Sequence, residues 1–363
     1  MKIVFALATH NPDDERVWYH QKKTLEEMGN EVYIISSCLK NYKLKNVVTF
    51  DSNKTKKQKI ETFVNELKLI EPNIIICDTP LTIFAAKKYK KKSNLKIYYD
   101  VTEWYPSKKN LRSCNFIITK IFKSILLSFV SFITPFFISG FIFGEYYKSL
   151  PFRILFPFKK HIYLPYYADI EYINALPTKD ISKECTLSYT GPATEEKGFY
   201  TFFEVARKCA EKNPNTKFIL RLICEPEIDL KIDNLHNIEI QYSKYLAFTD
   251  FCKEISKADI YFDLRKIDFE NRRCLPIKLF YYMACGRPVI YPNLKAIRKD
   301  VPEIDEFGFL VNSNNTVDTV EKISQYIKNE KLYKQHSNRA RELAEIKYNW
   351  KNIENQFIEF IEK

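Results

Sequence analysis

The segment Cys274-Leu-Pro-Ile-Lys-Leu-Phe-Tyr-Tyr-Met-Ala-Cys-Gly-Arg-Pro-Val-Ile290 has the clearest local pattern in the chain. Pro276 suits the first turn of a helix, where its missing N–H costs nothing. Gly286 can adopt the positive φ that ends a helix, and residues 288–291 have the composition of a short strand. The segment therefore predicts a short helix followed at once by a strand. An α/β protein uses this arrangement to point a helix N-terminus at an anionic ligand.

The two faces of this predicted helix differ. Leu279, Phe280 and Met283 form an apolar stripe. Lys278 and Tyr281 are three residues apart, so they share the opposite face. These two side chains are therefore candidates for contact with the ligand.

The rest of the chain alternates between short apolar strands and helices. In the first half, strands are predicted at residues 2–8, 31–36, 47–50, 73–77 and 96–101, and helices at 14–28, 56–70 and 80–91. In the second half, strands are predicted at 184–189, 217–223, 238–242, 259–264 and 309–311, and helices at 199–212, 248–257, 317–328 and within 332–361. Such alternation indicates two parallel sheets, each covered by helices, with a connection near residues 170–182.

Polar side chains follow two of the first-half strands. They are His10, Asp14 and Arg16 after the first strand, and Asp100, Thr102 and Glu103 at the end of the strand 96–101. Ligands of parallel sheets lie beyond the carboxyl ends of the strands, so we expect a binding site at this edge. Asp14 and Arg16 have a simpler alternative, which is a helix cap with a surface ion pair.

The composition fits two cytoplasmic domains. The chain has 363 residues, of which 45% are hydrophobic, enough for two cores. The 9 cysteines are odd in number and contain no C-x-x-C pair, which indicates reduced thiols. With only 7 glycines, a G-x-G-x-x-G nucleotide motif is absent. Residues 2–8 are too short for a signal peptide before acidic residues begin, so they are predicted to be the first strand.

The net charge of +12 raises the question of an anionic partner. Lysine runs at Lys54–Lys59 and Lys87–Lys92 are most simply solvated faces, and attraction to an anionic membrane leaflet is the alternative. A nucleic-acid site would combine clustered basic residues with aromatic platforms. Because these lysine runs are most simply solvated faces, we expect no nucleic-acid partner.

A long uncharged stretch, residues 125–144, has the length of a transmembrane helix. A helical projection of residues 117–134 instead separates a polar from an apolar side. The polar side holds Lys120, Lys123, Ser124, Ser131 and Thr134, and the apolar side Ile118, Phe122, Ile125, Phe129 and Ile133. Pro135 ends this helix, and a strand is predicted at 136–143. The helix either packs on its domain or lies in a membrane interface, which would attach the protein to the inner face of the membrane.

Four segments, in order along the chain, resemble one protein family. LPIKLFYYMACGRPVI at 275–290 is similar to LPxKLFEYMAxGxPVI of the retaining glycosyltransferases of family 4, which have the GT-B architecture. YTGPATEEKGFYTFFEVARK at 189–208 resembles the family's GRxxxEKGxxxLLEA phosphate loop. HNPDDERVWYHQKKTLEEMGNEV at 10–32 and YDVTEWYP at 99–106 are similar to HPPxDxRIFxKEAxxLxxxGxEV and YDVHExYP of one subfamily.

The resemblance implies an α/β protein with two Rossmann-like domains that face each other across a cleft. Residues 1–175 would form the acceptor-side domain and 176–345 the nucleotide-sugar domain. Residues 346–363 would form a crossover helix that packs on the first domain, with Trp350 at the kink. The implied activity is hexose transfer from a nucleotide sugar to a glycan or lipid-linked acceptor in surface-polysaccharide synthesis, with retention.

The resemblance also implies roles for individual residues. Lys197, in the loop closed by Gly198, matches the family's diphosphate lysine. The predicted donor-binding residues are Gly191, Lys197, Arg265, Arg272, Arg273, Lys278 and Tyr281. The predicted catalytic residues are Lys197, Arg273 and Glu103, and the acceptor-side residues are His10, Asp14, Arg16, Asp100 and Thr102. No metal or other cofactor is expected, because no Asp-x-Asp motif lies at a strand end.

The sequence departs from the family pattern at four positions. Pro192 replaces the arginine of the phosphate loop, Thr102 a donor-site histidine, and Arg273 and Tyr281 the two glutamates of a Glu-x7-Glu pair. In one hypothesis, Arg273, Arg272 or Arg265 replaces the lost cation and Tyr281 packs against the ribose or base. In the other, the protein keeps the fold without catalysis and serves as a binding or scaffold subunit of a polysaccharide-synthesis complex.

Overall fold

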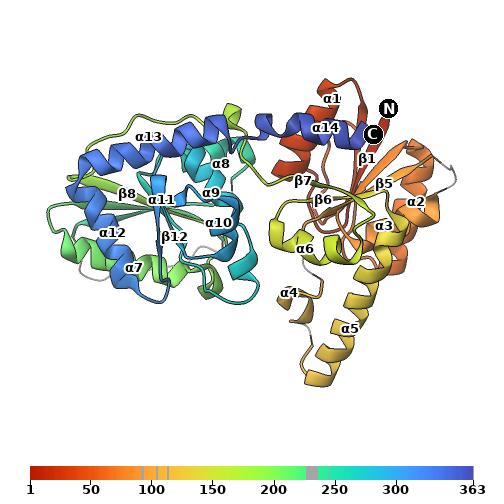
Figure 1. The fold of residues 1–363 in the computed structure, drawn as a ribbon, viewed down its shortest axis with the longest axis horizontal. Helices are drawn as coiled ribbons and strands as arrows, with labels where there is room; N and C mark the ends of the chain where they lie inside the picture. The colour runs from red at the N-terminus through yellow and green to blue at the C-terminus, as the bar shows by residue number, and fades with distance from the viewer. Residues whose placement is uncertain (91–93, 104, 113, 226–235, 245, 363) are drawn as a thin grey trace. The chain divides into compact units, whose positions relative to one another are not determined.

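The computed structural model describes residues 1–90, 94–103, 105–112, 114–225, 236–244 and 246–362 (Figure 1). The chain forms two compact units. The first unit comprises Met1–Pro165 and Ile353–Lys363, and the second unit comprises Tyr166–Asn352. The predicted boundaries, at 175/176 and 345/346, differ from these because Ala168 and Asn349 form a bridge, and the Trp350 N–H donates to the Ala168 carbonyl at 3.0 Å. These contacts hold both flanking segments in the second unit.

The first unit contains a parallel sheet of seven strands. They are β1 Lys2–Leu7, β2 Glu31–Ser37, β3 Val47–Phe50, β4 Ile74–Cys77, β5 Lys96–Val101, β6 Gly140–Phe143 and β7 Lys160–Tyr163, in the order β3-β2-β1-β4-β5-β6-β7. All four residues of β4 are buried, as expected for a central strand covered on both faces. The five strands predicted between residues 2 and 101 are confirmed within two residues, and β7 was not predicted.

Helices cover this sheet (Figure 1). They are the π-helix Arg16–Lys22, α1 Lys23–Glu27, α2 Lys56–Ile70, α3 Pro80–Tyr89, α4 Lys108–Leu111, α6 Tyr146–Leu155 and the C-terminal α14 Glu354–Glu362. A further helix of this unit, α5 Ile117–Ile133, runs away from the sheet (Figure 1). Thr55 and Gln58 form a capping box at α2, which explains why its start agrees with the prediction. In α14, the Glu362 carbonyl accepts from Lys96 Nζ at 2.9 Å, so the end of this helix lies beside the first residue of β5.

The predicted regular helix at 14–28 is wrong in its first half. Residues Arg16–Lys22 form a π-helix, and only Lys23–Glu27 is α-helical. Arg16 Nε and Gln21 Nε2 both donate to Asp100 Oδ2, each at 3.0 Å. In an α-helix, residues five apart point roughly 140° away from each other. The wider π turn brings both side chains to the same carboxylate.

The predicted strand at 136–143 is also too long. Thr134–Phe137 form a 3₁₀ turn that continues α5, and β6 begins only at Gly140. A Cβ atom at Gly140 would lie 2.9 Å from the Lys160 carbonyl oxygen and 3.0 Å from the Phe360 ring. The strand therefore starts where the chain has a glycine that permits close approach of β7 and α14.

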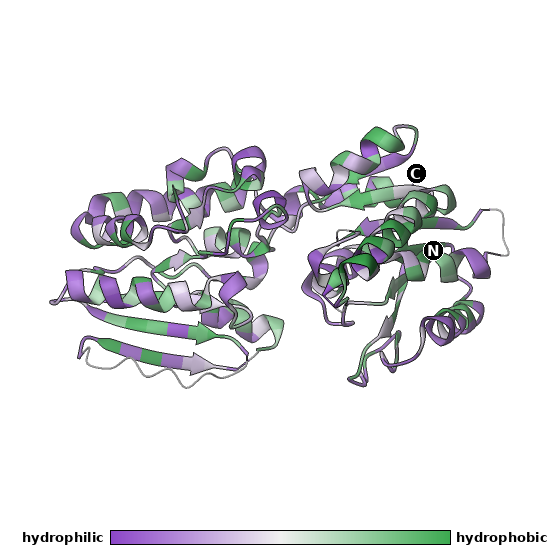
Figure 2. Ribbon diagram, turned by 90° about the horizontal axis from the view of Figure 1, so that it is seen from below, coloured by the Kyte–Doolittle hydropathy of each residue, from purple (hydrophilic) through white to green (hydrophobic). Residues whose placement is uncertain are grey.

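The second unit contains a parallel sheet of six strands. They are β8 Glu184–Thr190, β9 Lys217–Ile223, β10 Ile238–Ser243, β11 Ile260–Phe262, β12 Val289–Pro292 and β13 Gly308–Val311, in the order β10-β9-β8-β11-β12-β13. The helices are α7 Phe199–Lys212, α8 Phe248–Ile255, α9 Ile277–Ala284, α10 Lys295–Asp300, α11 Ile304–Phe307, α12 Thr316–Lys328 and α13 Glu330–Ile346. In Figure 2 the strands of both sheets are largely hydrophobic, whereas many helices are hydrophobic on one side only.

The segment 274–290 folds as predicted, with one difference. Pro276 is the N-cap of α9, Gly286 has φ +64°, and β12 follows. However, every residue from Leu279 to Ala284 is buried, so the helix has no exposed face at Tyr281. The prediction that Lys278 and Tyr281 share an open face is wrong, because α8 covers Tyr281: its ring lies edge-on to Phe248 and Phe251.

Helix α5 is the one long helix of the described chain with no buried residue. Together with the following turn, Ile117–Phe137 is long and apolar enough to cross a membrane, by length and composition alone. The alternative that this helix packs its apolar side on the domain is therefore wrong. In Figure 1, α5 runs away from the sheet of the first unit.

Candidate functional site

The strand orders give each unit one position where a ligand site is expected. In the first sheet, β2 and β3 lie on one side of β1 and β4 lies on the other. In the second sheet, β9 and β10 lie on one side of β8 and β11 on the other. At such points of reversal the loops after neighbouring strands diverge, and parallel α/β sheets bind ligands there, beyond the strands' carboxyl ends. The residues after β1 and β4, and after β8 and β11, therefore define two candidate sites.

Asp263, directly after β11, organises the site of the second unit. Its carboxylate accepts from Arg265 Nε at 3.0 Å and Nη2 at 2.5 Å, a bidentate pair that is almost wholly buried. Lys278 Nζ lies 3.3 Å from the same carboxylate. Burial would raise the pKa of Asp263, but the two cations outweigh it and hold that pKa well below its usual range. Asp263 is therefore ionised at every physiological pH.

The loop that carries Lys197 packs directly on the exit of β11. Glu195–Lys197 form a 3₁₀ turn, and Gly198, with φ +77°, starts α7. A Cβ atom on Gly198 would lie 2.5 Å from the Leu264 carbonyl oxygen, so only glycine fits. The Lys266 N–H also donates to the Glu196 carbonyl at 3.1 Å. These contacts fix the backbone of Lys197 beside Arg265, although the two are far apart in sequence.

Lys278 joins this loop to the end of β8. Its ammonium group donates to the Thr190 carbonyl at 2.5 Å. Gly191 follows with φ +117°, and a Cβ atom there would lie 3.5 Å from Lys278 Nζ. The missing side chain leaves space in front of the ammonium group. Gly191, Lys197, Arg265 and Lys278 are thus four predicted donor-binding residues that the structure brings together.

Positive charge exceeds negative charge in this cluster. Burial lowers the pKa of Lys278, the positive charges of Arg265 and Lys197 lower it further, and Asp263 raises it only in part. One buried carboxylate thus pairs with Arg265 and Lys278, and Lys197 adds a third positive charge near Lys278, while Glu196 lies 3.9 Å from Lys197 at the exposed rim. An anion bound here would relieve the repulsion among the cations, so the cluster is arranged to bind one.

The turn with Arg272 and Arg273 lies next to this cluster, because Asn271 Nδ2 donates to the Lys266 carbonyl at 3.0 Å, whereas Tyr281 lies under α8. Arg273 donates to the Phe269 carbonyl at 3.0 Å, and its guanidinium group lies 3.9 Å from the centre of the Phe269 ring. Its side chain is thus engaged within its own turn. Arg272 is exposed on the same turn, Asn271–Arg273. Tyr281, 2% exposed, is a packing residue under α8, so its predicted contact with a ribose or base is replaced by a structural role.

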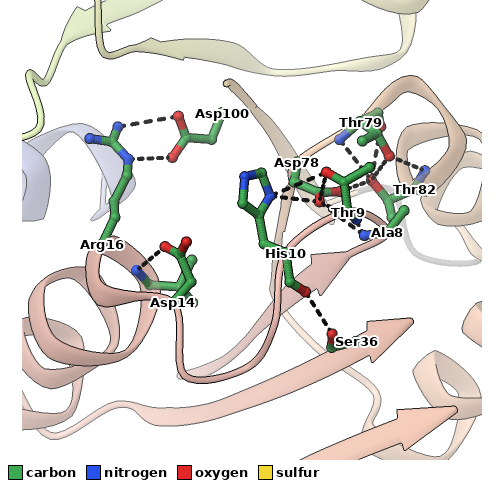
Figure 3. Close-up of polar contacts among 11 residues, drawn as sticks. Ala8, Thr9, His10, Asp14, Arg16, Ser36, Asp78, Thr79, Thr82 and Asp100 are labelled. Atoms are coloured by element: carbon green, nitrogen blue, oxygen red, sulfur yellow. Dashed lines mark hydrogen bonds and ion pairs between the residues drawn. The ribbon is translucent and has the colours of Figure 1, made fainter. Parts of the chain in front are cut away.

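Asp78 has the matching position in the first unit, directly after β4 (Figure 3). Its buried carboxylate accepts from the Ala8 and Thr9 N–H groups at 2.9 and 3.0 Å, from the Thr9 hydroxyl at 3.0 Å, and bonds His10 Nδ1 at 3.1 Å. Burial alone would lower the pKa of His10. The hydrogen bond and charge of Asp78 outweigh burial and raise it to about 9. His10 is therefore an imidazolium at neutral pH.

Arg16 and Asp100 form a second buried pair at the same edge (Figure 3). Arg16 is 2% exposed and donates through Nε and Nη2 to Asp100 at 3.0 and 3.2 Å, and through Nη1 to the Leu164 carbonyl at 2.8 Å. The predicted contact of Arg16 and Asp100 with an acceptor is therefore replaced by a structural role, because these donors and the carboxylate already bond each other. The alternative of a surface ion pair is also wrong, because the pair is buried.

The remaining acceptor-side candidates lie near these pairs. Asp14 Oδ1 accepts from the Val17 N–H at 3.3 Å, as a helix cap does, and burial raises its pKa. The Thr102 carbonyl accepts from Lys148 Nζ at 2.7 Å. Glu103 lines a cavity of about 200 Å³ whose other walls are Val101, Tyr105, Ser128, Ser131, Phe132, Lys148, Pro151, Phe152, Leu155 and Phe156. This cavity lies between the end of β5, α5 and α6.

Sequence reasoning missed Asp78, Asp263 and Tyr282. Tyr282 supports the donor cluster: its hydroxyl lies 2.9 Å from the Thr190 hydroxyl, and its ring stacks on Tyr261 at 4.1 Å. A signal for the aspartates exists, because each is the first polar residue after a short apolar strand, in IIICD and IYFD. That rule selected Asp100 and could have selected these two. Within the described part of the chain, no three His, Cys, Asp or Glu side chains gather as a metal site.

Comparisons with known proteins agree with this architecture. Residues 214–359 match the family described as glycosyl transferase-like. No curated protein matches the chain. Sucrose-phosphate synthase from Thermosynechococcus elongatus is 13% identical, with a TM-score of 0.70 over 99% of this chain and 98% of that chain. Anabaena HepE in complex with UDP-glucose is 15% identical, with a TM-score of 0.71 over 99% and 98%.

A glycosyltransferase from Rickettsia africae ESF-5 is 13% identical, with a TM-score of 0.67 over 99% of this chain and 97% of that chain. Each similarity extends over nearly the full length of both proteins and therefore includes both parallel sheets. The predicted fold class is confirmed: this chain has the GT-B fold of glycosyltransferases.

Proposed function

We propose that the protein is a glycosyltransferase that moves a hexose from a nucleoside diphosphate sugar to a glycan or lipid-linked acceptor in cell-surface polysaccharide synthesis. The observation that carries the proposal is the cluster around Asp263, where Lys197, Arg265 and Lys278 supply more positive charge than the carboxylate balances. A diphosphate is the anion that a nucleotide sugar presents. The complexes of Anabaena HepE with UDP and with UDP-glucose favour a uridine nucleotide as the first donor to test.

The chemistry follows from where charge develops. When the bond between the sugar and the diphosphate breaks, the leaving phosphate gains negative charge. Fixed cations and backbone N–H groups that lie close to this phosphate stabilise the transition state more than the ground state. Lys197 and Lys278 supply the cations without a metal, and Arg265 keeps Asp263 ionised and in place. We propose transfer with retention, in line with the family that the sequence resembles.

The cavity beside α5 favours a lipid-linked acceptor over a soluble glycan. Its walls are mostly apolar, and two charged residues, Glu103 and Lys148, also line it. An apolar chain would be bound by Phe132, Phe152 and Leu155, while Glu103 would accept a hydrogen bond from the acceptor hydroxyl. Glu103 thus remains the candidate to orient the acceptor.

The proposal is tested with purified protein. From a panel of UDP, GDP and CMP, with their sugars, we expect one of the two nucleoside diphosphates, and not the monophosphate CMP, to raise the melting temperature, and its sugar nucleotide to be hydrolysed slowly or transferred. Addition of EDTA should leave the rate unchanged, since the cluster needs no metal. Absence of any thermal response would contradict the proposal.

A second function rests on a specific observation. Pro192, Thr102 and Tyr281 stand where the resembling family has an arginine, a histidine and a glutamate, and Tyr281 is buried as packing. A binding or scaffold subunit would retain nucleotide binding without turnover. Stabilisation by a sugar nucleotide that is neither hydrolysed nor transferred to any supplied acceptor would favour this second function.

A further inference from the structure

The described residues of the first unit leave a large apolar surface exposed. It is formed by α5 and the end of α6, where Ile118, Phe122, Phe129, Ile154 and Phe158 are 76%, 70%, 58%, 68% and 69% exposed. Isolated apolar side chains are common on protein surfaces, but a continuous patch of this size marks an interaction site. We define the docking surface as the exposed apolar side chains of residues 116–136 and 150–158.

The docking surface is attached firmly to its unit. Phe132 and Phe136, at the end of α5, pack on Phe156 with ring centroids 5.5 and 5.6 Å apart. Phe156 is buried and belongs to the main core of the first unit. The helix therefore has a defined direction, and its apolar side chains are held together with those of α6.

The charges around this surface are almost all positive. From residue 104 to residue 168 the sequence contains nine lysines and arginines and one acidic residue, Glu145. Glu145 is buried and paired with Lys148 at 2.6 Å, so it does not offset the exposed basic side chains. Lys120 lies on α5 itself, and Arg153 on α6; both are exposed. An apolar surface bordered by cations is complementary to the headgroups and acyl chains of an anionic bilayer.

We propose that the docking surface inserts into an anionic membrane, with α5 in the interface and the basic side chains at the phosphate headgroups. Lipid would then cover the fourteen large apolar side chains that are exposed on the docking surface. A second copy of this chain would also cover the surface, but each copy would bring the same positive charges to the contact, which opposes pairing. The inference goes beyond the transfer reaction and does not depend on it.

The first experiment measures sedimentation of the whole protein with sucrose-loaded vesicles. We expect binding to vesicles of phosphatidylcholine with phosphatidylglycerol and at least ~10-fold weaker binding to phosphatidylcholine alone, from the contribution of each basic side chain near an anionic surface. The triple variant Ile118→Ser, Phe122→Ser, Phe129→Ser should lose at least ~10-fold of the binding, because apolar burial drives insertion. Leu69→Ser is the matched control, since Leu69 is 78% exposed on α2, and it should bind as the wild type does.

Three outcomes would overturn the proposal. The first is a wild-type protein that does not sediment with anionic vesicles, and the second is a triple variant that binds undiminished. The third is light scattering that shows a wild-type dimer converted to monomer by the triple substitution, which would assign the surface to a second copy. A charge variant, Lys120→Glu with Lys123→Glu, separates the two contributions: it should weaken binding to anionic vesicles and leave binding to neutral vesicles unchanged.

Discussion

The two units use the same device for different ends. In each, an aspartate directly after a strand lies beside the point where the strand order reverses: Asp78 accepts hydrogen bonds from the loop after β1, and Asp263 pairs with Arg265 of its own loop and with Lys278 of α9. Asp78 receives two backbone N–H groups, a hydroxyl and one histidine. Asp263 pairs with Arg265 and Lys278, and Lys197 adds a third positive charge nearby.

The two sites differ in how much positive charge remains unpaired and is available to a ligand. In the first unit the charges pair off one to one, His10 with Asp78 and Arg16 with Asp100. In the second unit one carboxylate is shared by Arg265 and Lys278, so positive charge remains. The first arrangement fixes loops, and we propose that the second both fixes loops and attracts an anion. Four substitutions test this contrast, in order of decreasing expected effect.

The largest effect is expected at Asp263. Asp263→Asn leaves Arg265 and Lys278 without their counter-charge, and removing one partner of a buried ion pair costs about 3–5 kcal/mol. We expect this loss in the free energy of unfolding measured in urea. The matched control is Asp250→Asn. The Asp250 carboxylate is 59% exposed on α8 and pairs with Lys253, so this substitution should change stability by less than about 1 kcal/mol. Equal effects of the two substitutions would contradict the account.

Lys278 is the next test, because it pairs with Asp263 and is also proposed to contact the ligand. Lys278→Met removes a cation but leaves the buried Arg265–Asp263 pair, so the protein should fold. We expect a loss of at least ~100-fold in kcat/KM for the sugar nucleotide, the scale of losing one contact to developing charge. Lys253→Met, 72% exposed on α8, is the control and should leave kcat/KM unchanged. Full activity of the Lys278 variant would remove this residue from the site.

His10 should make the stability of the first unit depend on pH. Its pKa is raised from 6.5 to about 9, so between these values the folded state holds a proton that the unfolded state has released. This contribution is complete below pH 6.5 and is lost as pH rises through 9. We expect wild type to lose about 1–3 kcal/mol of unfolding free energy relative to His10→Gln over this range. Parallel curves of stability against pH would show that the His10–Asp78 pair contributes nothing.

Arg273 is expected to show the smallest effect. Its guanidinium group stacks on Phe269 in its own turn, and such an exposed contact is worth about 0.5–1 kcal/mol. Arg273→Ala should therefore change kcat/KM by less than about 5-fold. A loss of ~100-fold would instead support the role at the diphosphate that the sequence suggested, and would mean that this turn moves to the ligand.

Local patterns in the sequence were enough for most of the fold. Helix α2 and strand β5 begin and end where capping residues and apolar runs predict, and Pro276 and Gly286 bound α9 as expected. These features depend on neighbours a few residues away. The π-helix Arg16–Lys22 was not predictable in this way, because its side chains bond Asp100, which lies far away in the sequence, on β5.

The candidate site was only partly predictable, for the same reason. Lys197 was found by resemblance and Lys278 also by its place on the predicted helix, but Asp263, which pairs with Lys278 and Arg265, takes its role from the adjacency of β8 and β11, which no single segment encodes. Tyr281 was assigned to the ligand because a helical projection places it opposite the apolar stripe. The projection does not reveal that α8 packs on that side.

The central claim is that the cluster around Asp263 binds a diphosphate. Isothermal titration of the whole protein with UDP and with UMP tests it, because the two ligands differ only in the second phosphate. The account predicts that UDP binds at least ~10-fold tighter than UMP, and that Lys197→Ala removes most of this difference while affinity for UMP changes little, as expected for a charge-assisted contact to that phosphate. Equal affinities for UDP and UMP, or an undiminished preference in Lys197→Ala, would contradict it.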